Sequence, residues 1–162
     1  MNKNEPFIRL GMPEDFNEVM HLCSLATEEN GFINPNLNKV GQEIWAGLNQ
    51  NYGVVGLVGK PGETIEGGVL IRIGAMWYGD GFVAEEKAVF VHPDYRSAKG
   101  RRAQALCEFS KNFASQLGLP LMIGVLSNHR TKSKIRMYER IFGEQTGAYF
   151  LYGAQTGSSH IQ

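Results

Sequence analysis

The stretch that decides the fold runs from Val89 to Leu117 and reads VFVHPDYRSAKGRRAQALCEFSKNFASQL. It opens with three apolar residues typical of a strand and stops at Pro93, after which four cations fall within seven residues, 96–102. From 103 onward, apolar or small residues recur at the i, i+3, i+4, i+7 spacing of one buried helix face, until Gly118. We therefore predict a strand, a basic loop and an amphipathic helix in direct succession.

A basic loop at the start of a helix favours the binding of an anion. The first N–H groups of a helix have no partner within it, and the helix dipole attracts negative charge to that end. Neither the phosphate-loop pattern GxxxxGK[ST] nor the dinucleotide pattern GxGxxG occurs in the chain, which makes a nucleotide-binding protein the weakest of the alternatives. We expect a ligand that carries phosphate.

Residues 91–96, Val-His-Pro-Asp-Tyr-Arg, resemble the acyl-CoA-binding motif of the GCN5-related N-acetyltransferases. In that family the pattern V-x-P-x-[YW]-R leads into a [QR]-x-x-G-x-[GA] loop and a helix with Leu three residues after the last small residue. Ala103 and Leu106 match the end of the motif. The loop from Arg96 to Ala103 is two residues longer than usual, and Gly100 is its only glycine.

The order of predicted elements over residues 7–152 is βααβββαβαβ, which is also the order in that family. The resemblance implies an α/β (α+β) fold with a mixed, mostly antiparallel sheet flanked by helices. It also implies that the two strands on either side of the long helix splay apart to admit pantetheine, and the strand–helix–strand crossover itself implies that they are parallel. The predicted strands are 7–10, 53–59, 64–78, 82–91, 121–126 and 145–152, and the predicted helices are 12–30, 37–50, 103–117 and 131–142.

Length and composition set the remaining bounds. A chain of 162 residues with 16 basic and 16 acidic side chains suits one domain, which we place at 1–152 with a flexible tail at 153–162. Zero net charge argues against a nucleic-acid partner. No run of 18 apolar residues occurs, so we expect a soluble, cytoplasmic protein without a membrane partner. Cys23 and Cys107 both fall on apolar helix positions and are read as small buried side chains.

The resemblance implies transfer of an acetyl group from acetyl-CoA to a primary amine of a small molecule or peptide. Tyr138, in the sequence Met-Tyr-Glu-Arg, matches the family tyrosine that protonates the leaving thiolate. Packing against its helix neighbours is the alternative. Glu85 and Glu86 are candidates for the base that deprotonates the amine, and since neighbouring strand residues face opposite sides, at most one can point at the site. A purely surface role for this pair is equally compatible with the sequence.

The resemblance also implies the binding residues. Backbone groups near the end of the strand would bind pantetheine, and the loop would bind the pyrophosphate; the cofactor-binding set is Val89, Phe90, Val91, Arg96, Ser97, Ala98, Lys99, Gly100, Arg101, Arg102, Ala103 and Asn128. Glu28, Glu29 and Phe32, between the first two helices, would contact the acceptor amine. A solvated helix end is the alternative for the two glutamates, and the sequence favours it. No spacing of Cys and His indicates a metal, and a homodimer is compatible with the family.

A non-catalytic acyl-CoA-binding module or sensor is the alternative function. The lengthened loop and the undecided base favour it, whereas the matched tyrosine favours an enzyme. Acetyl-CoA binding without amine-dependent thiol release would distinguish the module from the enzyme.

Overall fold

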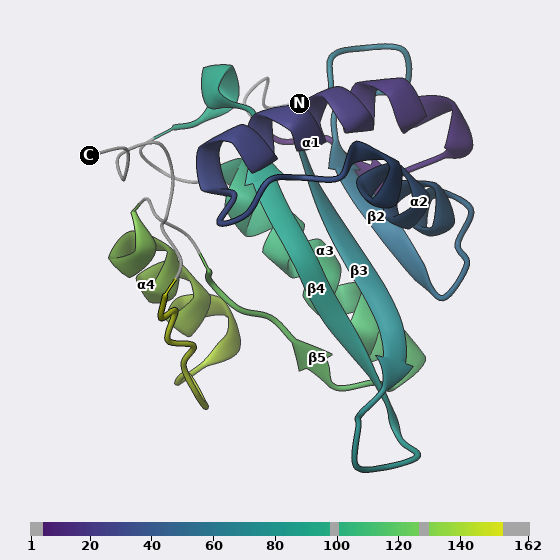
Figure 1. The fold of residues 1–162 in the computed structure, drawn as a ribbon. Helices are drawn as coiled ribbons and strands as arrows, with labels where there is room; N and C mark the ends of the chain where they lie inside the picture. The colour runs from purple at the N-terminus through teal and green to yellow at the C-terminus, as the bar shows by residue number, and fades with distance from the viewer. Residues whose placement is uncertain (1–4, 98–100, 127–129, 154–162) are drawn as a thin grey trace.

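A computed structural model describes residues 5–97, 101–126 and 130–153 of the chain. Its sheet has five strands in the order β1-β2-β3-β4-β5, with helices on both faces (Figure 1). The strands are β1 (Ile8–Leu10), β2 (Gly53–Val58), β3 (Gly67–Ala75), β4 (Phe82–Val91) and β5 (Leu121–Met122). The α-helices are α1 (Phe16–Asn30), α2 (Leu37–Leu48), α3 (Arg101–Leu117) and α4 (Thr131–Phe142).

The first four strands pair antiparallel, and β5 lies parallel to β4, as the crossover through α3 requires. The β3–β4 ladder covers the whole of both strands, with one irregularity: Leu70 lies opposite Ala88, and the next residue, Ile71, lies opposite Glu86. Lys87 is therefore an extra residue in β4, a β-bulge that re-aims the side chains beside it. The predicted mixed, mostly antiparallel sheet is confirmed.

Two apolar cores cover the two faces of the sheet. The core under α1 and α2 includes Leu57 of β2, which has no exposed surface. The core under α3 includes Leu106, which is likewise fully buried, together with Ile71 of β3. Every residue of β2 is buried, because both faces of this strand are covered. Full burial of a leucine contributes roughly 1.5–3 kcal/mol, so these two cores set the stability of the scaffold.

The N-terminal connection is fixed by one ion pair. Both terminal nitrogens of Arg9 in β1 lie 2.8 Å from the Asp15 carboxylate, which also accepts the Met12 N–H at 2.8 Å. The hydrogen bonds from Arg9 lower the pKa of Asp15, so this contact holds at neutral pH. The predicted helix start at 12–15 is a short 3₁₀ turn, Pro13–Asp15, that leads directly into α1.

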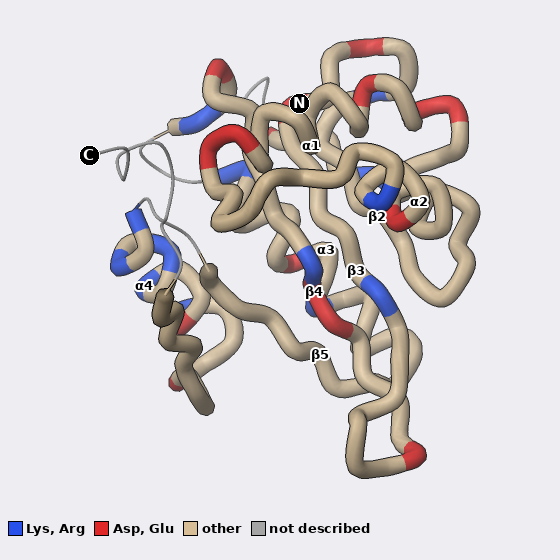
Figure 2. Tube along the Cα trace, viewed as in Figure 1, with Lys and Arg blue, Asp and Glu red and all other residues tan. Residues whose placement is uncertain are grey.

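The α4 helix differs from the others because it is strongly basic. Its twelve residues carry four cations and one acid, and Lys and Arg gather along it in Figure 2. None of its residues is fully buried. Among the described residues, no helix combines the length and the apolar character needed to cross a membrane.

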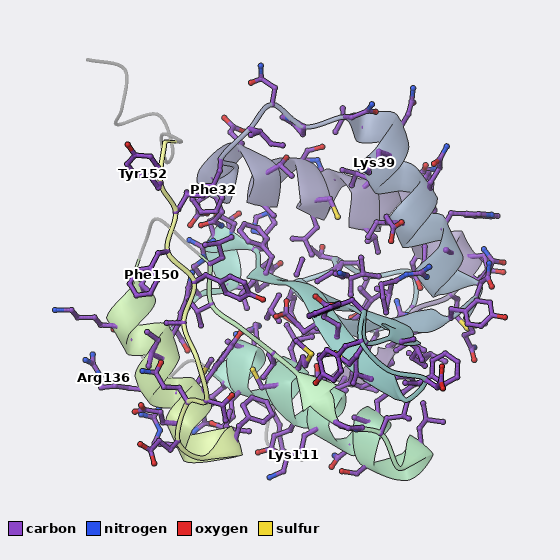
Figure 3. All side chains as sticks on the ribbon, turned by 60° about the horizontal axis from the view of Figure 1, so that its bottom comes forward. Phe32, Lys39, Lys111, Arg136, Phe150 and Tyr152 are labelled. Atoms are coloured by element: carbon purple, nitrogen blue, oxygen red, sulfur yellow. The ribbon has the colours of Figure 1, made fainter. Side chains whose placement is uncertain are left out.

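The prediction of a last strand at 145–152 is wrong. These residues are described and adopt no strand; Phe150 and Tyr152 are 94% and 99% exposed and project from the segment that follows α4 (Figure 3). The strand at 121–126 was also predicted too long, since only Leu121–Met122 is assigned to β5. A two-residue strand offers the C-terminal segment too short an edge for a ladder, and an apolar, aromatic run alone does not supply one.

The other boundaries differ by a few residues at element ends, where fraying is usual. The predicted strand 64–78 is shorter at both ends as β3, because Met76 to Gly81 form the turn into β4. The predicted tail at 153–162 lies outside the described residues except for Gly153.

Candidate active site

The site is built where β4 and β5 separate. Their pairing consists of Ala84 opposite Leu121 and Glu85 opposite Met122, and then it stops. In Figure 1 the chain after β5 turns away from β4 toward α4. In the described part of the chain, no strand pairs with the outer edge of β4 from residue 86 to 91, although β3 remains paired along its other edge. The predicted splaying of these two strands is present.

Glu86 points into this opening, whereas Glu85 does not. Ala84, two residues before Glu86, is buried in the α3-side core, and period-2 alternation places Glu86 on the same face. The Gly124 N–H, from the segment after β5, hydrogen-bonds the Glu86 carboxylate across the gap. Glu85 instead pairs with Lys87 at 3.1 Å, with 43% of its side chain exposed. Of the two candidate bases, the geometry selects Glu86.

The protonation of Glu86 is set by its surroundings. Burial raises the pKa of Glu86 to about 7; the Gly124 N–H opposes that shift, and the nearby Glu85 adds to it. A carboxyl group with this pKa exchanges its proton near neutral pH, as a general base must. The sheet fixes the backbone position of Glu86, so the surroundings that raise its pKa are fixed as well.

Tyr138 lies on α4 and reaches back toward α3. Its hydroxyl hydrogen-bonds the Cys107 thiol, and its ring packs edge-to-face on Phe142, with ring centroids 5.8 Å apart. Burial first, and then the nearby Cys107 and Glu86, raise the pKa of Tyr138. The phenol therefore holds its proton at neutral pH and is available as a donor. Glu86 comes to this part of the site from β4 and Tyr138 from α4, and the charge of Glu86 contributes to the raised pKa of Tyr138.

The end of α4 is tied to α3. Lys111 Nζ donates to the Ile141 carbonyl at 3.2 Å, and a cation at this position also complements the negative end of the helix dipole. Gly143, with φ +96°, ends the helix in a conformation that favours glycine. Through these contacts the helix that carries Tyr138 is held against the helix that carries Cys107.

The start of the predicted pyrophosphate loop is held by Arg96. Both terminal nitrogens of its guanidinium bind the Glu29 carboxylate, at 2.7 and 3.0 Å, and Nε donates to the Val91 carbonyl at 3.1 Å. The same group stacks over the Phe90 ring at 5.1 Å. A bidentate pair of this kind has a defined geometry. Glu29, predicted to contact the acceptor, and Arg96, predicted to contact the cofactor, are thus joined to each other.

Arg102 is also engaged within the protein. It donates to Glu66 at 2.9 Å and to the Tyr95 carbonyl at 3.1 Å, and it stacks over the Tyr95 ring. Arg101, the first residue of α3, and Ser97 are exposed, while Ala103 is half-buried. The remaining predicted loop residues, Ala98, Lys99 and Gly100, and the predicted pantetheine contact Asn128, lie outside the described residues.

The predicted acceptor residues lie at the end of α1 and just beyond it. Glu28 is exposed, and Phe32 is half-buried, on the same side of the molecule as Phe150 and Tyr152 (Figure 3). Lys134 of α4 lies near Glu29 and Arg96; burial lowers its pKa and the nearby Glu29 opposes that shift. This corner therefore brings together α1, the end of β4 and α4.

Two residues of the site were not predicted from the sequence. Cys107 was assigned to the core on its apolar helix position, and Gly124 was one residue of an expected strand. The sequence carries no signal for either role, because the contacts to Tyr138 and Glu86 depend on how α4 and β5 leave the sheet. In the described part of the chain, no cluster of His, Cys, Asp and Glu side chains is arranged to hold a metal ion.

No family model and no curated protein sequence matches this chain. Solved structures do. An aminoglycoside acetyltransferase from an uncultured soil metagenomic sample, in complex with trehalose, superposes with a TM-score of 0.65 at 17% identity, over 96% of this chain and 100% of that one. AAC(6')-Iy in complex with the bisubstrate analogue CoA-S-monomethyl-acetylneamine superposes with a TM-score of 0.66 at 18% identity, over 91% and 97%.

A third similar structure is the ribosomal-protein-alanine N-acetyltransferase from Brucella melitensis biovar Abortus 2308. It has a TM-score of 0.64 at 15% identity and covers 90% of this chain and 96% of its own. At these identities the likeness concerns the arrangement of the chain in space. Together with the splayed β4–β5 pair, it shows that the chain adopts the GCN5-related N-acetyltransferase fold.

Proposed function

We propose that this protein is an acetyl-CoA-dependent N-acetyltransferase that moves the acetyl group directly to a primary amine of a small molecule or peptide. The observation that carries the proposal is the pair formed by Glu86 and Tyr138 at the point where β4 and β5 separate. A carboxyl group that titrates near neutral pH and a phenol that keeps its proton are the two groups that acyl transfer to an amine requires.

The donor site fits the opening along β4. Beyond Glu85 the outer edge of this strand presents backbone N–H and C=O groups that no strand among residues 5–97, 101–126 and 130–153 pairs with, and buried backbone groups require partners. The amide-bearing arm of CoA would supply them, alongside Val89 and Phe90. The pyrophosphate would lie at the start of α3, where backbone N–H groups and the exposed Arg101 favour an anion.

Arg96 and Arg102 would act mainly by shaping this loop. Each is already bound to a glutamate, Arg96 to Glu29 and Arg102 to Glu66, and each also bonds a backbone carbonyl. These contacts fix the two ends of the segment that includes Ala98, Lys99 and Gly100. We propose that this segment binds the pyrophosphate through its backbone, with Ser97 and Ala103 at its ends.

Acetyl-CoA supplies an activated acyl carbon and a thiolate leaving group. The amine nitrogen forms the new bond to that carbon as the carbon–sulfur bond breaks. An amine that arrives as a cation first releases one proton to solvent. Glu86 then accepts the proton that the attacking nitrogen loses, and Tyr138 gives its proton to the departing sulfur. One proton enters the site and one leaves it, so the total held by the protein is unchanged. A positioned acid and a positioned base each contribute roughly 10²–10⁴-fold to such a rate.

The acceptor would enter from the side of the α1–α2 connection. Glu28 is exposed there, and Phe32 offers an apolar surface. An acidic side chain beside the entrance favours an amine that arrives as a cation. Structures with this fold include an aminoglycoside acetyltransferase and a ribosomal-protein-alanine N-acetyltransferase, so small-molecule and peptide amines both belong in a screen. The proposal includes no metal, and a homodimer is compatible with it.

The experiment has two stages. The melting temperature is first measured with acetyl-CoA, CoA and ATP, because a ligand at about 100 times its Kd stabilises the folded state by about 2.7 kcal/mol, a shift of several degrees. A panel of amines is then tested for acetyl-CoA-dependent thiol release. We expect stabilisation by both CoA species but not by ATP, and thiol release with at least one amine.

A matched pair of variants locates the donor site. Arg101→Ala removes an exposed cation at the start of α3, and Lys39→Ala removes one on α2, whose side chain projects away from the body of the molecule in Figure 3. We expect R101A to weaken acetyl-CoA binding about 3–10-fold and K39A to leave it unchanged. Equal effects would place the pyrophosphate elsewhere. Stabilisation by acetyl-CoA without thiol release from any amine would favour a binding module over an enzyme.

A further inference from the structure

The charged side chains of this protein are divided unevenly between two of its helices. Residues 10–38, which contain α1, carry five acidic side chains and no Lys or Arg. Residues 130–142, which contain α4, carry five cations and one acid. Figure 2 shows the same division, with red along α1 and blue along α4. A chain of zero net charge thus presents one acidic helix and one basic helix.

The exposed charges on these helices have no counterion within the described part of the chain. Glu14, in the turn that leads into α1, and Glu18, four positions later, are both exposed. Lys132, Arg136 and Arg140 are exposed at the same spacing along α4. No salt bridge among residues 5–97, 101–126 and 130–153 involves any of these five side chains. Like charges at this spacing repel each other, so each helix is suited to a surface of opposite charge.

Exposed apolar side chains lie where the two charged helices approach each other. Ile33, three residues after the end of α1, is 83% exposed, and Phe150 and Tyr152, after α4, are 94% and 99% exposed. Figure 3 places Phe150 and Tyr152 on the same side of the molecule as Phe32, and Figure 1 shows α1 ending on the side where α4 lies. Large apolar side chains gathered on one surface are typical of a protein–protein contact.

A surface of this kind is complementary to itself. A two-fold axis through the apolar residues brings the acidic half of one copy over the basic half of the other, and it does so twice. We propose that two copies of this chain associate through this surface, with α1 of each copy facing α4 of the other and the apolar residues at the centre. Aromatic side chains at the centre with charges around them are the usual arrangement of a specific interface.

The association does not depend on the proposed function, although it would affect the same side of the molecule. Glu28 and Phe32 lie at and just beyond the end of α1, beside this surface, so the second copy would form one wall of the proposed acceptor entrance. The second copy would also cover the exposed face of α4, a helix with no fully buried residue in a single copy. The inference therefore goes beyond the proposed reaction and assigns a partner to the charged helices.

The oligomeric state at several protein and salt concentrations tests the inference, measured by sedimentation equilibrium. We expect the wild type to be a dimer at low salt, with a Kd that rises about 10-fold at high salt because salt screens exposed charges. The double variants Lys132→Glu/Arg136→Glu and Glu14→Lys/Glu18→Lys should each weaken association about 100-fold or more. Each variant places like charges opposite each other at both α1–α4 contacts, where the wild type has partly exposed ion pairs.

Two further variants separate this surface from other causes of association. Lys39→Glu/Lys60→Glu is the matched control, because it reverses two exposed cations that lie outside α1 and α4; its Kd should stay within about 2-fold of the wild-type value. Phe150→Ser/Tyr152→Ser removes the apolar centre and should weaken association about 10–100-fold. Thermal melts check that each variant is folded, since all four side chains are exposed.

Mixing the two charge-reversed variants is the sharpest test. In a mixed pair each altered helix faces a helix of opposite charge, so association should return although neither variant associates alone. A wild type that stays monomeric at low salt would overturn the inference. So would a mixture that stays monomeric, or charge-reversed variants with the wild-type Kd. None of these measurements uses turnover, so a failure here and a failure of the proposed acetyl transfer are distinguishable.

Discussion

The two halves of this molecule differ in how they are held together. Strands β2, β3 and β4 form long ladders, and cores on both faces bury residues such as Leu57 and Leu106 completely. On the other side, β5 pairs with β4 over two residues, α4 has no fully buried residue, and Phe150 in the segment after α4 is 94% exposed. The proposed base comes from the first half, and the proposed acid comes from the second.

The two halves meet where β5 separates from β4, which is also where the candidate active site lies. Where β5 leaves β4, the strand pairing stops after two residue pairs, and the proposed donor site lies along the edge that follows. The well-packed half fixes the positions of the residues along the β4 edge. By contrast, α4 is attached through a few polar contacts, such as that of Lys111 with Ile141 and that of Cys107 with Tyr138. Regions with few buried contacts open at low free-energy cost, so we expect the local stability of α4 to be lower than that of the ladders in the packed half.

The largest effect should follow from damage to the packed half. Leu57→Ala is expected to lower the free energy of unfolding by about 3–5 kcal/mol, because it leaves a cavity in a fully buried core. Ile141→Ala on the half-buried face of α4 should cost only about 1 kcal/mol. Urea denaturation of both variants measures the two losses in the free energy of unfolding. Equal losses would mean that α4 belongs to the same packed unit as β2.

The next effect concerns the acid carried by α4. Tyr138→Phe should lower kcat about 100-fold, because the departing thiolate loses its proton donor, while the KM for acetyl-CoA stays within about 3-fold. Tyr149→Phe is the control, since this tyrosine lies in the segment after α4 and is 76% exposed. Steady-state kinetics with one acceptor amine measures kcat and the KM for acetyl-CoA in both variants. An unchanged kcat in Y138F would reduce Tyr138 to a packing role beside Phe142.

Glu86, which belongs to the packed half, should make the stability of the folded protein depend on pH. Its pKa is raised to about 7 from an ordinary value of 4.5, so its contribution to stability is fully present below pH 4.5 and is lost as the pH rises through 7. Glu86→Gln removes this loss, and at pH 8 it should be more stable than the wild type by about 2 kcal/mol.

Thermal melts at pH 5 and pH 8 check the prediction for Glu86. The stability advantage of E86Q should be larger at pH 8 than at pH 5. Glu85→Gln, at the exposed residue next to it in β4, should show little difference between the two pH values. A similar pH trend in both variants would mean that the buried face of β4 does not set the pKa of Glu86.

The smallest effect is expected where the two halves meet at the surface. Glu29→Gln breaks the bidentate pair with Arg96, whose partners are each about a quarter to a third exposed. The loss should be below about 1 kcal/mol, as for other partly exposed ion pairs. Acetyl-CoA binding should weaken about 2–5-fold, because Arg96 no longer holds the start of the loop. Calorimetric titration measures this, and tighter binding would indicate that Glu29 competes with the pyrophosphate for Arg96.

The packed half was predictable from the sequence because its signals are local and periodic. The helix that ends at Leu117 and the strand 82–91 both have the predicted C-terminal ends, and their connection fixed the parallel pairing of β5. The apolar, aromatic run at the end of 145–152 is typical of a strand, yet among the described residues no strand pairs with it. Strand formation depends on a partner, and a pattern in one segment does not report its partner.

The candidate site was predictable in its residue types more than in its contacts. Tyr138 and the pair Glu85 and Glu86 could be named from the resemblance, but choosing Glu86 needed the position of Gly124 after β5. The link from Tyr138 to Cys107 needed the packing of α4 on α3. Arg96 was expected to face the cofactor, and its pairing with Glu29, 67 residues away, has no sequence signature. Long-range contacts of this kind follow from the completed fold.

The proposed mechanism depends most on Glu86 accepting a proton where β4 and β5 separate. The most direct measurement is the pH dependence of kcat/KM for acetyl transfer to a single amine, in the wild type, E86Q and E85Q. We predict that the wild type and E85Q share an inflection near pH 7 which E86Q lacks, with the titration of the amine itself common to all three. An inflection near pH 7 that persists in E86Q, or its absence from the wild type, would contradict the account.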